Sequence, residues 1–322
     1  MTEFELIDRY FRRPARGAVL GVGDDAAILA PTPGCEVVVS VDMLVEGRHF
    51  FADADPEALG HKTLAVNLSD LAAMGAAPRW ALLAGALPSA DERWLAAFAR
   101  GFFALADRYA IDLVGGDTTR GPRNLCVTVL GEVPAGAALR RDGARADDSV
   151  WVSGRLGDAA LALAHRQHRL RLDATDFAAC ERALTRPEPR LALGLALRGV
   201  ASAAIDLSDG LAGDLAHVLA ASRVAAAIEL DAVPRSAELD GQMRGPAREI
   251  ALACLLAGGD DYELCFTVPI ARDGEVAALA GRFGLALTRI GAIVPGAGLE
   301  VRDAAGRVLD PLPRAFDHFA TG

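Results

Sequence analysis

The chain has 322 residues, of which 52% are hydrophobic and 24% are charged, and its formal net charge is −10. This length suits two domains that each bury a core, and the composition is that of a globular rather than a disordered chain. The arginines are scattered instead of forming a basic stripe, so we expect no nucleic-acid binding. No apolar run reaches the roughly 18 residues that a transmembrane helix needs, so we expect no membrane association.

The cysteines predict a reduced, cytoplasmic protein. They form no C-x-x-C pair and no zinc-binding spacing with histidine, and a scattered odd set is typical of buried free thiols. The cysteines are Cys35, Cys126, Cys180, Cys254 and Cys265. The segment that begins at Met1 is acidic and lacks the hydrophobic region of a signal peptide.

The first half of the chain predicts an α/β domain. Phe4, Ile7 and Phe11 recur at helical spacing before Pro14, which indicates a short amphipathic helix over 2–13. Strands are predicted at 36–42, 80–88, 111–117 and 124–133, and helices at 57–74 and 91–109. Strands that alternate with helices in this way are typical of α/β architecture.

A polar segment over 134–149 marks a change in composition, and we place a domain boundary in it, giving domains 1–137 and 138–322. The second half begins with a strand at Val150 and a glycine-rich turn. Further strands are predicted at 226–230 and after Gly258, and helices at 190–199, 211–221, 248–257 and 275–283.

The segment from Ala65 to Gly75 is the most unusual part of the sequence. It places Asn67, Ser69 and Asp70 within a helix that is otherwise small and apolar. A helix of this kind is predicted to be buried, and a buried carboxylate is costly unless a cation or hydrogen bonds compensate it. The same Leu-Ser-Asp triplet returns at 207–209, again after an apolar run.

Several aspartates share this setting beside glycine, Ser/Thr or an apolar run. They are Asp25, Asp42, Asp70, Asp117, Asp206 and Asp209. Any one alone is more often a helix N-cap or a turn former. If several converge, each close pair repels by roughly 4 kcal/mol at about 4 Å, and a divalent cation removes that repulsion. We interpret the set as a magnesium site that holds a nucleotide, because the donors are oxygens rather than thiols or imidazoles.

Common nucleotide-binding motifs are absent. The pattern Gly21-x-Gly23-x-x-Ala26 only formally matches a dinucleotide fingerprint, because Pro31 follows too soon for the required helix. Gly60-His-Lys62-Thr63 resembles only the tail of a P-loop, and the protein-kinase motifs and a G-x-S-x-G elbow are missing.

A set of motifs together resembles the thiamine-monophosphate kinase family. The motifs are Gly21-Val-Gly-Asp-Asp-Ala-Ala, Val41-Asp-Met-Leu-Val-Glu-Gly-Arg-His-Phe, Ala65-Val-Asn-Leu-Ser-Asp-Leu-Ala-Ala-Met-Gly, Gly115-Gly-Asp-Thr-Thr, Ile205-Asp-Leu-Ser-Asp-Gly-Leu and Gly258-Gly-Asp-Asp-Tyr-Glu-Leu. They occur in the expected order, from about residue 3 to Asp317-His-Phe-Ala-Thr. This family belongs to the aminoimidazole ribonucleotide synthetase superfamily.

The resemblance implies a fold of α/β plus α+β class. The N-terminal α/β domain would bind ATP and Mg²⁺, and its sheet would pair with that of a second copy into a β-barrel across a homodimer. The implied activity is ATP-dependent phosphorylation of thiamine monophosphate to thiamine diphosphate, the last step of thiamine diphosphate biosynthesis.

The resemblance also implies roles for individual residues. Magnesium ligands would be Asp25, Ser40, Val41, Asp42, Asp70, Asp117, Asp206 and Asp209. ATP contacts would come from Gly116, Arg141 and Ser208, and thiamine-phosphate contacts from His49, Asp260 and Phe316. Three of these depart from the family pattern: Val41 stands where Thr is frequent, Asp260 replaces Glu, and Phe316 replaces a larger or hydroxylated aromatic residue.

Phosphate-to-phosphate transfer needs no side-chain base, because the second pKa of a phosphomonoester is about 6 and the acceptor is already mostly ionised. We therefore expect direct in-line transfer without a phosphoenzyme. Aminoimidazole ribonucleotide synthetase activity is the nearest enzymatic alternative, and a magnesium- and nucleotide-binding module without catalysis is an alternative of another class. Selenophosphate synthetases and the hydrogenase-maturation relatives are disfavoured, since the chain lacks their reactive N-terminal cysteine and their Pro-Arg-x-Cys tail, respectively.

Overall fold

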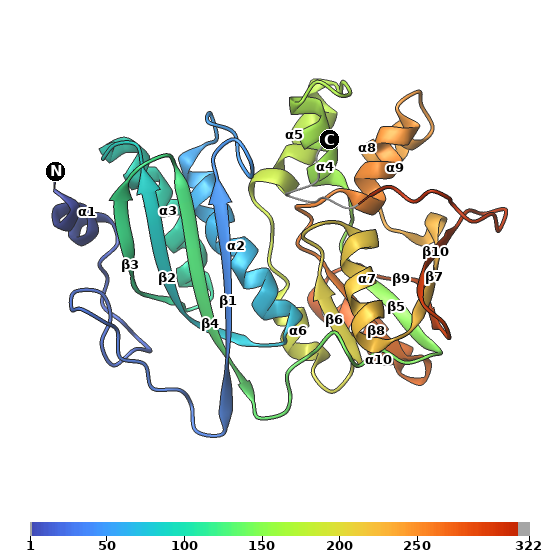
Figure 1. Cartoon of the computed structure of the whole chain (residues 1–322), viewed down its shortest axis with the longest axis horizontal. Helices are drawn as coiled ribbons and strands as arrows, with labels where there is room; N and C mark the ends of the chain where they lie inside the picture. Colours follow the sequence, from blue (N-terminus) through green and yellow to red (C-terminus); the bar gives the residue numbers. More distant parts are fainter. Residues whose placement is uncertain (1, 315–322) are drawn as a thin grey trace. The chain divides into compact units, whose positions relative to one another are not determined.

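The computed structural model describes residues 2–314, which form two compact units (Figure 1). The N-terminal unit comprises the described residues up to Leu71 together with Ala76–Ala138. The C-terminal unit comprises Ala72–Gly75 and the described residues from Leu139 onward. Among the helices of these residues, none combines the length and apolar character needed to cross a bilayer.

A four-stranded sheet forms the centre of the N-terminal unit. Its strands, in spatial order, are β1 (Cys35–Val45), β4 (Asn124–Pro134), β2 (Ala77–Leu87) and β3 (Asp112–Arg120). The β1–β4 and β4–β2 pairs are antiparallel, and the β2–β3 pair is parallel. The parallel pair is joined through helix α3 (Glu92–Arg108), as parallel neighbours require a crossover connection.

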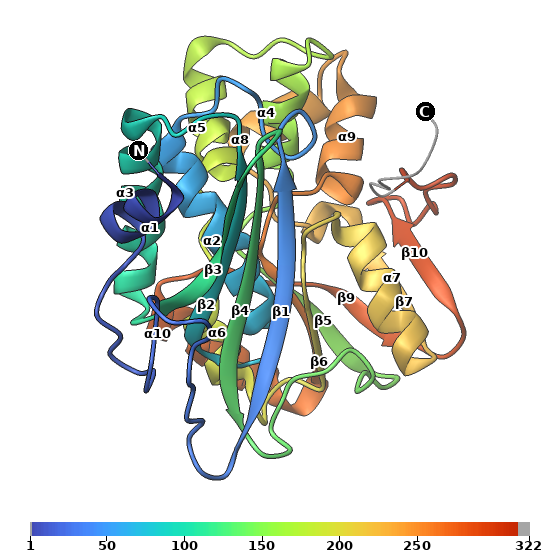
Figure 2. The ribbon, with the colours of Figure 1, turned by 60° about the vertical axis from the view of Figure 1, so that its left-hand side comes forward.

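Two helices cover one face of this sheet, α2 (Pro56–Ala73) and α3 (Figures 1 and 2). Glycines let their backbones approach closely. A Cβ at Gly60 would lie 2.0 Å from the carbonyl oxygen of Phe98, and one at Gly101 would lie 1.8 Å from that of Glu57. Asp91 caps α3 by accepting the N–H groups of Arg93 and Trp94. The short helix α1 (Glu3–Tyr10) contacts α3 and β3.

The other face of the sheet presents apolar side chains to the surface of the chain. Alternate residues of β1 are exposed, as the pleat of a strand dictates. These residues are Val37, Val39, Val41 and Met43, with exposed fractions of 41%, 58%, 57% and 51%. A solvated strand face is ordinarily polar, so this apolar row is a feature that requires an explanation.

The C-terminal unit is built on a mixed six-stranded sheet. Its strands, in spatial order, are β10 (Gly298–Arg302), β7 (Ala225–Glu229), β9 (Leu287–Val294), β5 (Asp148–Ser153), β8 (Leu264–Pro269) and β6 (Ala203–Asp206). Its helices are α4 (Asp158–Arg166), α5 (Ala174–Thr185), α6 (Leu191–Leu197), α7 (Leu211–Ser222), α8 (Ala237–Met243), α9 (Arg248–Ala257) and α10 (Asp273–Phe283), with short 3₁₀ turns at Leu230–Ala232 and Ile270–Arg272.

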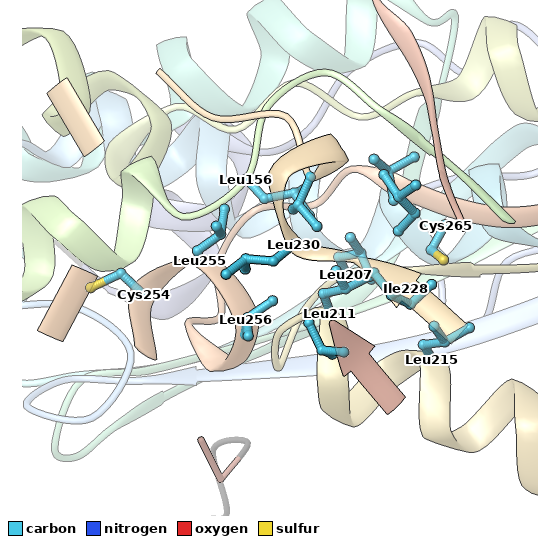
Figure 3. Close-up of a cluster of buried hydrophobic side chains, with 14 of the residues drawn as sticks. Leu156, Leu207, Leu211, Leu215, Ile228, Leu230, Cys254, Leu255, Leu256 and Cys265 are labelled. Carbon is cyan, nitrogen blue, oxygen red and sulfur yellow. The ribbon is translucent and has the colours of Figure 1, made fainter. Parts of the chain in front are cut away.

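An aliphatic core holds α7 and α9 against this sheet (Figure 3). Leu207 and Leu211, on either side of the turn between β6 and α7, are 0% and 1% exposed. Leu255 and Leu256 of α9 are fully buried in the same cluster. The turn that carries the second Leu-Ser-Asp triplet is therefore anchored at both ends by buried leucines.

The two-domain, mixed α/β class expected from the sequence is confirmed. The strands predicted to end at Asp42 and Asp117 instead continue to Val45 and Arg120, so these aspartates lie within strands. Helices α5 and α8 and strands β6, β9 and β10 were not predicted. Their sequences are short or interrupted by polar residues, and the periodicity is too weak to define them.

Candidate functional site

Strand β1 and helix α2 bring three of the predicted site residues together. The hydroxyl of Ser40 donates to Asp70 Oδ2 at 2.5 Å, and the backbone N–H of Asp42 donates to Asn67 Oδ1 at 2.9 Å. The Asn67 amide in turn donates to the carbonyl of Thr63 at 3.0 Å. Helical spacing puts Thr63, Asn67 and Asp70 on one face of α2, which points at the strand.

Val41 lies between Ser40 and Asp42, and its side chain points to the exposed face of the sheet because strand side chains alternate. The valine side chain has no donor atom. Its carbonyl oxygen is therefore the only group that Val41 can offer to a cation.

Asp25 and Asp117 line one cavity of about 560 Å³ in the N-terminal unit. The loop around Asp25, strand β3 and helix α1 form its walls. Asp25 donates its backbone N–H to Asp24 Oδ1 at 2.9 Å, and both aspartates, like Asp117, are exposed. The cavity therefore holds carboxylates that water or a cation can reach.

Gly116 lies beside Asp117 in this cavity and has φ +151, a conformation that favours glycine. A Cβ there would lie 1.8 Å from the carbonyl oxygen of Leu83 on the neighbouring strand. Strand β3 can thus pair closely with β2 at this point only because residue 116 has no side chain.

His49 follows β1 in a tight turn. Its Nδ1 accepts the backbone N–H of Val45 at 3.0 Å, so the ring is held by its own turn. Nearby, Arg123 pairs with Glu46 and lies over the ring of Trp94, which fixes the same turn to β4 and α3. The position of His49 is therefore set by local hydrogen bonding.

In the C-terminal unit, Asp206 ends strand β6 and is only 5% exposed. The next residues form the turn into α7, where Gly210 has φ +105. A Cβ on Gly210 would lie 2.7 Å from the carbonyl carbon of Ala257, so this turn packs directly against the end of α9. Ser208 and Asp209, at the corner of this turn, are half-buried.

The segment around Asp260 lies against this turn. The backbone N–H of Asp260 donates to the carbonyl of Ser208 at 2.9 Å, and that of Tyr262 donates to the carbonyl of Leu207 at 2.8 Å. A Cβ on Gly259 would lie 2.3 Å from the Ser208 carbonyl oxygen, so the approach requires glycine. The predicted nucleotide, metal and substrate residues Ser208, Asp209 and Asp260 are therefore neighbours.

Asp260 itself has an unusual backbone, with φ +71, and Tyr262 has φ +50. Non-glycine residues in this region are uncommon and cluster at functional sites. The hydroxyl of Tyr262 donates to Asp260 Oδ1 at 3.1 Å, which orients the carboxylate.

The sequence analysis singled out Asn67 of α2 without giving it a role, and it missed Asp214 altogether. Asp214, in the first turn of α7, is 4% exposed, and its Oδ2 accepts the N–H groups of Asp209 and Gly210, each at 3.0 Å. Burial is the main cause that raises the pKa of Asp214 to about 7, against the opposing effect of these hydrogen bonds. The available signal was an acid in an otherwise apolar helix, four residues after a glycine.

Arg141 and Phe316 are the two predicted residues that remain to be placed. Arg141 is exposed in the segment between β4 and β5, and its carbonyl accepts a hydrogen bond from Ser222 at 2.7 Å. Phe316 lies outside the described residues.

The residues fit magnesium in chemistry but are not gathered into a closed cage. Within residues 2–314, no group of three or more His, Cys, Asp or Glu side chains could hold a metal ion. The side-chain donors are all carboxylate or hydroxyl oxygens, the type that Mg²⁺ prefers, and Mg²⁺ commonly binds through one or two carboxylates plus water and phosphate. The β1–α2 contacts and the Asp25–Asp117 cavity each provide one or two carboxylates of this kind.

The fold and these turns define a class of protein. Residues 23–133 match the family described as AIR synthase related protein, N-terminal domain, and residues 145–304 match its C-terminal domain. Structures of the hydrogenase maturation protein HypE share the fold, with a TM-score of 0.78 at 21% identity in the E. coli protein. The chain is thus a member of the AIR synthase related proteins.

Within that class, the chain belongs to the thiamine-monophosphate kinase family. It is 46% identical to the thiamine-monophosphate kinase of Salmonella typhimurium over 327 residues, which covers 99% of this chain and 98% of the relative. The crystal structure of the Stenotrophomonas maltophilia thiamine-monophosphate kinase has a TM-score of 0.86 at 47% identity, covering 96% and 98% of the two chains. The structure of AaThiL complexed with AMPPCP and TMP has a TM-score of 0.77 at 30% identity, covering 98% and 96%.

Proposed function

We propose that this protein transfers the terminal phosphoryl group of ATP to thiamine monophosphate, giving thiamine diphosphate and ADP. One observation carries the proposal: a relative that shares the fold and is 30% identical to this chain has been solved in complex with AMPPCP and TMP. The family relationship, which extends over 99% of the chain, supports carrying this pair of ligands over. The pairing of a nucleotide analogue with a phosphate acceptor is what a phosphotransferase requires.

The acceptor phosphate supplies its own nucleophile. Its second pKa is about 6, so it is mostly dianionic at neutral pH and needs no side-chain base. The task of the protein is then to align the two phosphates and to neutralise their charge. We propose direct in-line transfer, with no phosphorylated enzyme.

Magnesium supplies that neutralisation when it is bound. We propose that Asp25, Asp42, Asp70 and Asp117, with Ser40 Oγ and the Val41 carbonyl, hold it from the N-terminal domain, residues 1–137. Asp206 and Asp209 would add ligands from the C-terminal domain, residues 138–322. The all-oxygen donor set and the hydrogen bond that orients Asp70 support this assignment.

The remaining predicted residues would bind the two substrates. We propose ATP contacts from Gly116, Arg141 and Ser208, and thiamine-phosphate contacts from His49, Asp260 and Phe316. Support for Gly116 comes from its lack of a side chain where two strands meet, and support for Asp260 from its fixed, strained backbone.

We also propose that two copies pair through the exposed face of the N-terminal sheet to close a β-barrel. The support is the row Val37, Val39, Val41 and Met43, which a second copy of the same face would cover. We place the protein in the cytoplasm, in line with its five free cysteines.

Tracing the phosphoryl group tests this proposal. ATP labelled at the γ-position is mixed with the protein, Mg²⁺ and thiamine monophosphate, and the products are separated. Label in thiamine diphosphate supports the proposed reaction, and its absence there contradicts it. Label on the protein after incubation with ATP alone would overturn the direct route.

A further inference from the structure

We propose that Asp214 is a positioning residue, which fixes the turn carrying Ser208 and Asp209 and, through it, the backbone of Asp260. This inference rests on the proposed function, because it concerns how the same site is held in shape. Asp214 belongs to none of the predicted ligand sets, and its side chain is turned toward the backbone of its own turn.

The peptide group between Ser208 and Asp209 is held at both ends. Its N–H, on Asp209, donates to Asp214 Oδ2 at 3.0 Å, and its C=O, on Ser208, accepts the N–H of Asp260 at 2.9 Å. Rotation of this peptide would break both hydrogen bonds together. The orientation that Asp214 imposes is therefore the one that keeps Asp260 beside Ser208.

The next peptide reinforces this arrangement. The N–H of Gly210 donates to the same Oδ2 at 3.0 Å, so successive N–H groups converge on one carboxylate oxygen. Successive backbone N–H groups at the start of a helix normally form an anion-binding cradle. Here the cradle is filled by Asp214, so Asp209 and Gly210 direct these N–H groups to the protein and not to a phosphate.

Burial makes the arrangement rigid. Asp214 is 4% exposed, and Leu207 and Leu211 on either side of the turn are fully buried. Gly210 and Gly259 allow backbones to approach where any Cβ would lie within 2.7 Å of a backbone atom. The turn cannot relax outward without exposing the core of the C-terminal unit.

Two substitutions separate positioning from simple helix capping. Asp214→Asn keeps an oxygen that can accept the same N–H groups, whereas Asp214→Ala removes the acceptor. Asp173→Ala serves as the control, because Asp173 also accepts backbone N–H groups at a helix start, from Thr175 and Asp176, but is the N-cap of α5.

The readouts are the dissociation constant of Mg²⁺·AMPPCP by calorimetry, the KM for thiamine monophosphate, and the melting temperature. Loss of the acceptor for both backbone N–H groups should raise the dissociation constant and the KM of Asp214→Ala each about tenfold. Asp214→Asn should restore both to within about threefold of wild type. Asp173→Ala should lower the melting temperature and leave both constants unchanged.

Equal binding by Asp214→Ala and wild type would overturn the proposal, as would an Asp214→Asn variant as impaired as the alanine variant. If Asp214→Ala does not fold, Asp214→Leu, which also removes the acceptor but keeps a branched side chain of similar shape, takes its place in the same two measurements. The calorimetric measurement of Mg²⁺·AMPPCP binding does not require thiamine monophosphate. A wild-type protein that binds Mg²⁺·AMPPCP but does not phosphorylate thiamine monophosphate would therefore contradict only the proposed function.

Discussion

The hydroxyl of Ser40 on strand β1 donates to the carboxylate of Asp70 on helix α2 at 2.5 Å. These residues are thirty positions apart, and the contact fixes one oxygen of a half-buried carboxylate. The neighbouring bond from the Asp42 N–H to Asn67 ties the same strand to the same helix. The polar residues of α2 thus serve as an ordered set of oxygens facing β1.

Asp70→Asn should abolish most activity while preserving the fold. The asparagine oxygen can still accept the Ser40 hydroxyl, but the negative charge that we propose to attract magnesium is lost. Because metal-based charge stabilisation is worth several kcal/mol, kcat should fall about 100-fold or more. The measurement is steady-state ADP release, with circular dichroism to verify folding. Asp91→Asn, at the N-cap of α3, is the control, and comparable activity of Asp70→Asn and wild type would refute a role in the reaction.

Gly116→Ala should destabilise the N-terminal domain by at least about 2 kcal/mol, since it adds left-handed strain and a clash with the backbone of Leu83. Gly115→Ala is the adjacent control, because its Cβ would meet only Leu82 Cδ2 at an ordinary 3.6 Å. Denaturant unfolding measures both. Equal stability of the two variants would show that the close β2–β3 approach is not required.

Val39→Asp should convert the proposed dimer into a monomer, because it places a charge in the apolar row on β1. Light scattering coupled to size exclusion measures the mass. Val308→Asp, at an apolar residue of similar exposure in the C-terminal unit, should leave the dimer intact. A wild-type monomer, or a Val39→Asp protein with unchanged mass, would rule out pairing through this face.

Asp158→Asn should change the pH dependence of stability. Burial raises the pKa of Asp158, with Glu238 acting in the same direction and Ser236 and Arg155 opposing it. A raised folded-state pKa gives stability that is complete below the ordinary aspartate pKa and is lost as pH rises through the folded-state value. Asparagine does not titrate, so the variant does not lose this stability. Its unfolding free energy relative to wild type should therefore increase as pH rises from the ordinary aspartate pKa to the raised folded-state pKa.

Asp240→Asn is the control, because the pKa of Asp240 is shifted in the direction opposite to that of Asp158. The Asp240 pKa is lowered, chiefly by its hydrogen bond to Arg235, so its carboxylate stabilises the fold above the ordinary pKa. The Asn variant should therefore lose stability relative to wild type as pH rises. Parallel pH curves for the two variants would be inconsistent with the assigned shifts.

The sequence predicted the family and the class of fold, because motifs such as Gly115-Gly-Asp and Leu207-Ser-Asp occur in the order that the family has. It predicted many of the helices, because apolar residues recur at helical spacing over long segments. The predicted ends of β1 and β3 were too early, because an aspartate was taken as the end of the strand. A strand can carry an aspartate in its interior, as the half-buried Asp42 and the exposed Asp117 do.

The contacts that shape the candidate site were beyond prediction, because they join residues far apart in the chain. Ser40 with Asp70 and the Ser208 carbonyl with Asp260 depend on how strands and helices pack. Asp214 was overlooked for a related reason: its partners are backbone N–H groups, which leave no mark in the sequence. The ligand roles of the predicted residues stay predictions.

The most direct test of the account is the initial rate of ADP release from ATP and Mg²⁺, measured with and without thiamine monophosphate while thiamine diphosphate is quantified. We predict negligible release without the acceptor, and with it one thiamine diphosphate for each ADP, a signal that chelation of Mg²⁺ abolishes. ADP release that is indifferent to thiamine monophosphate, or that yields no thiamine diphosphate, would contradict the account.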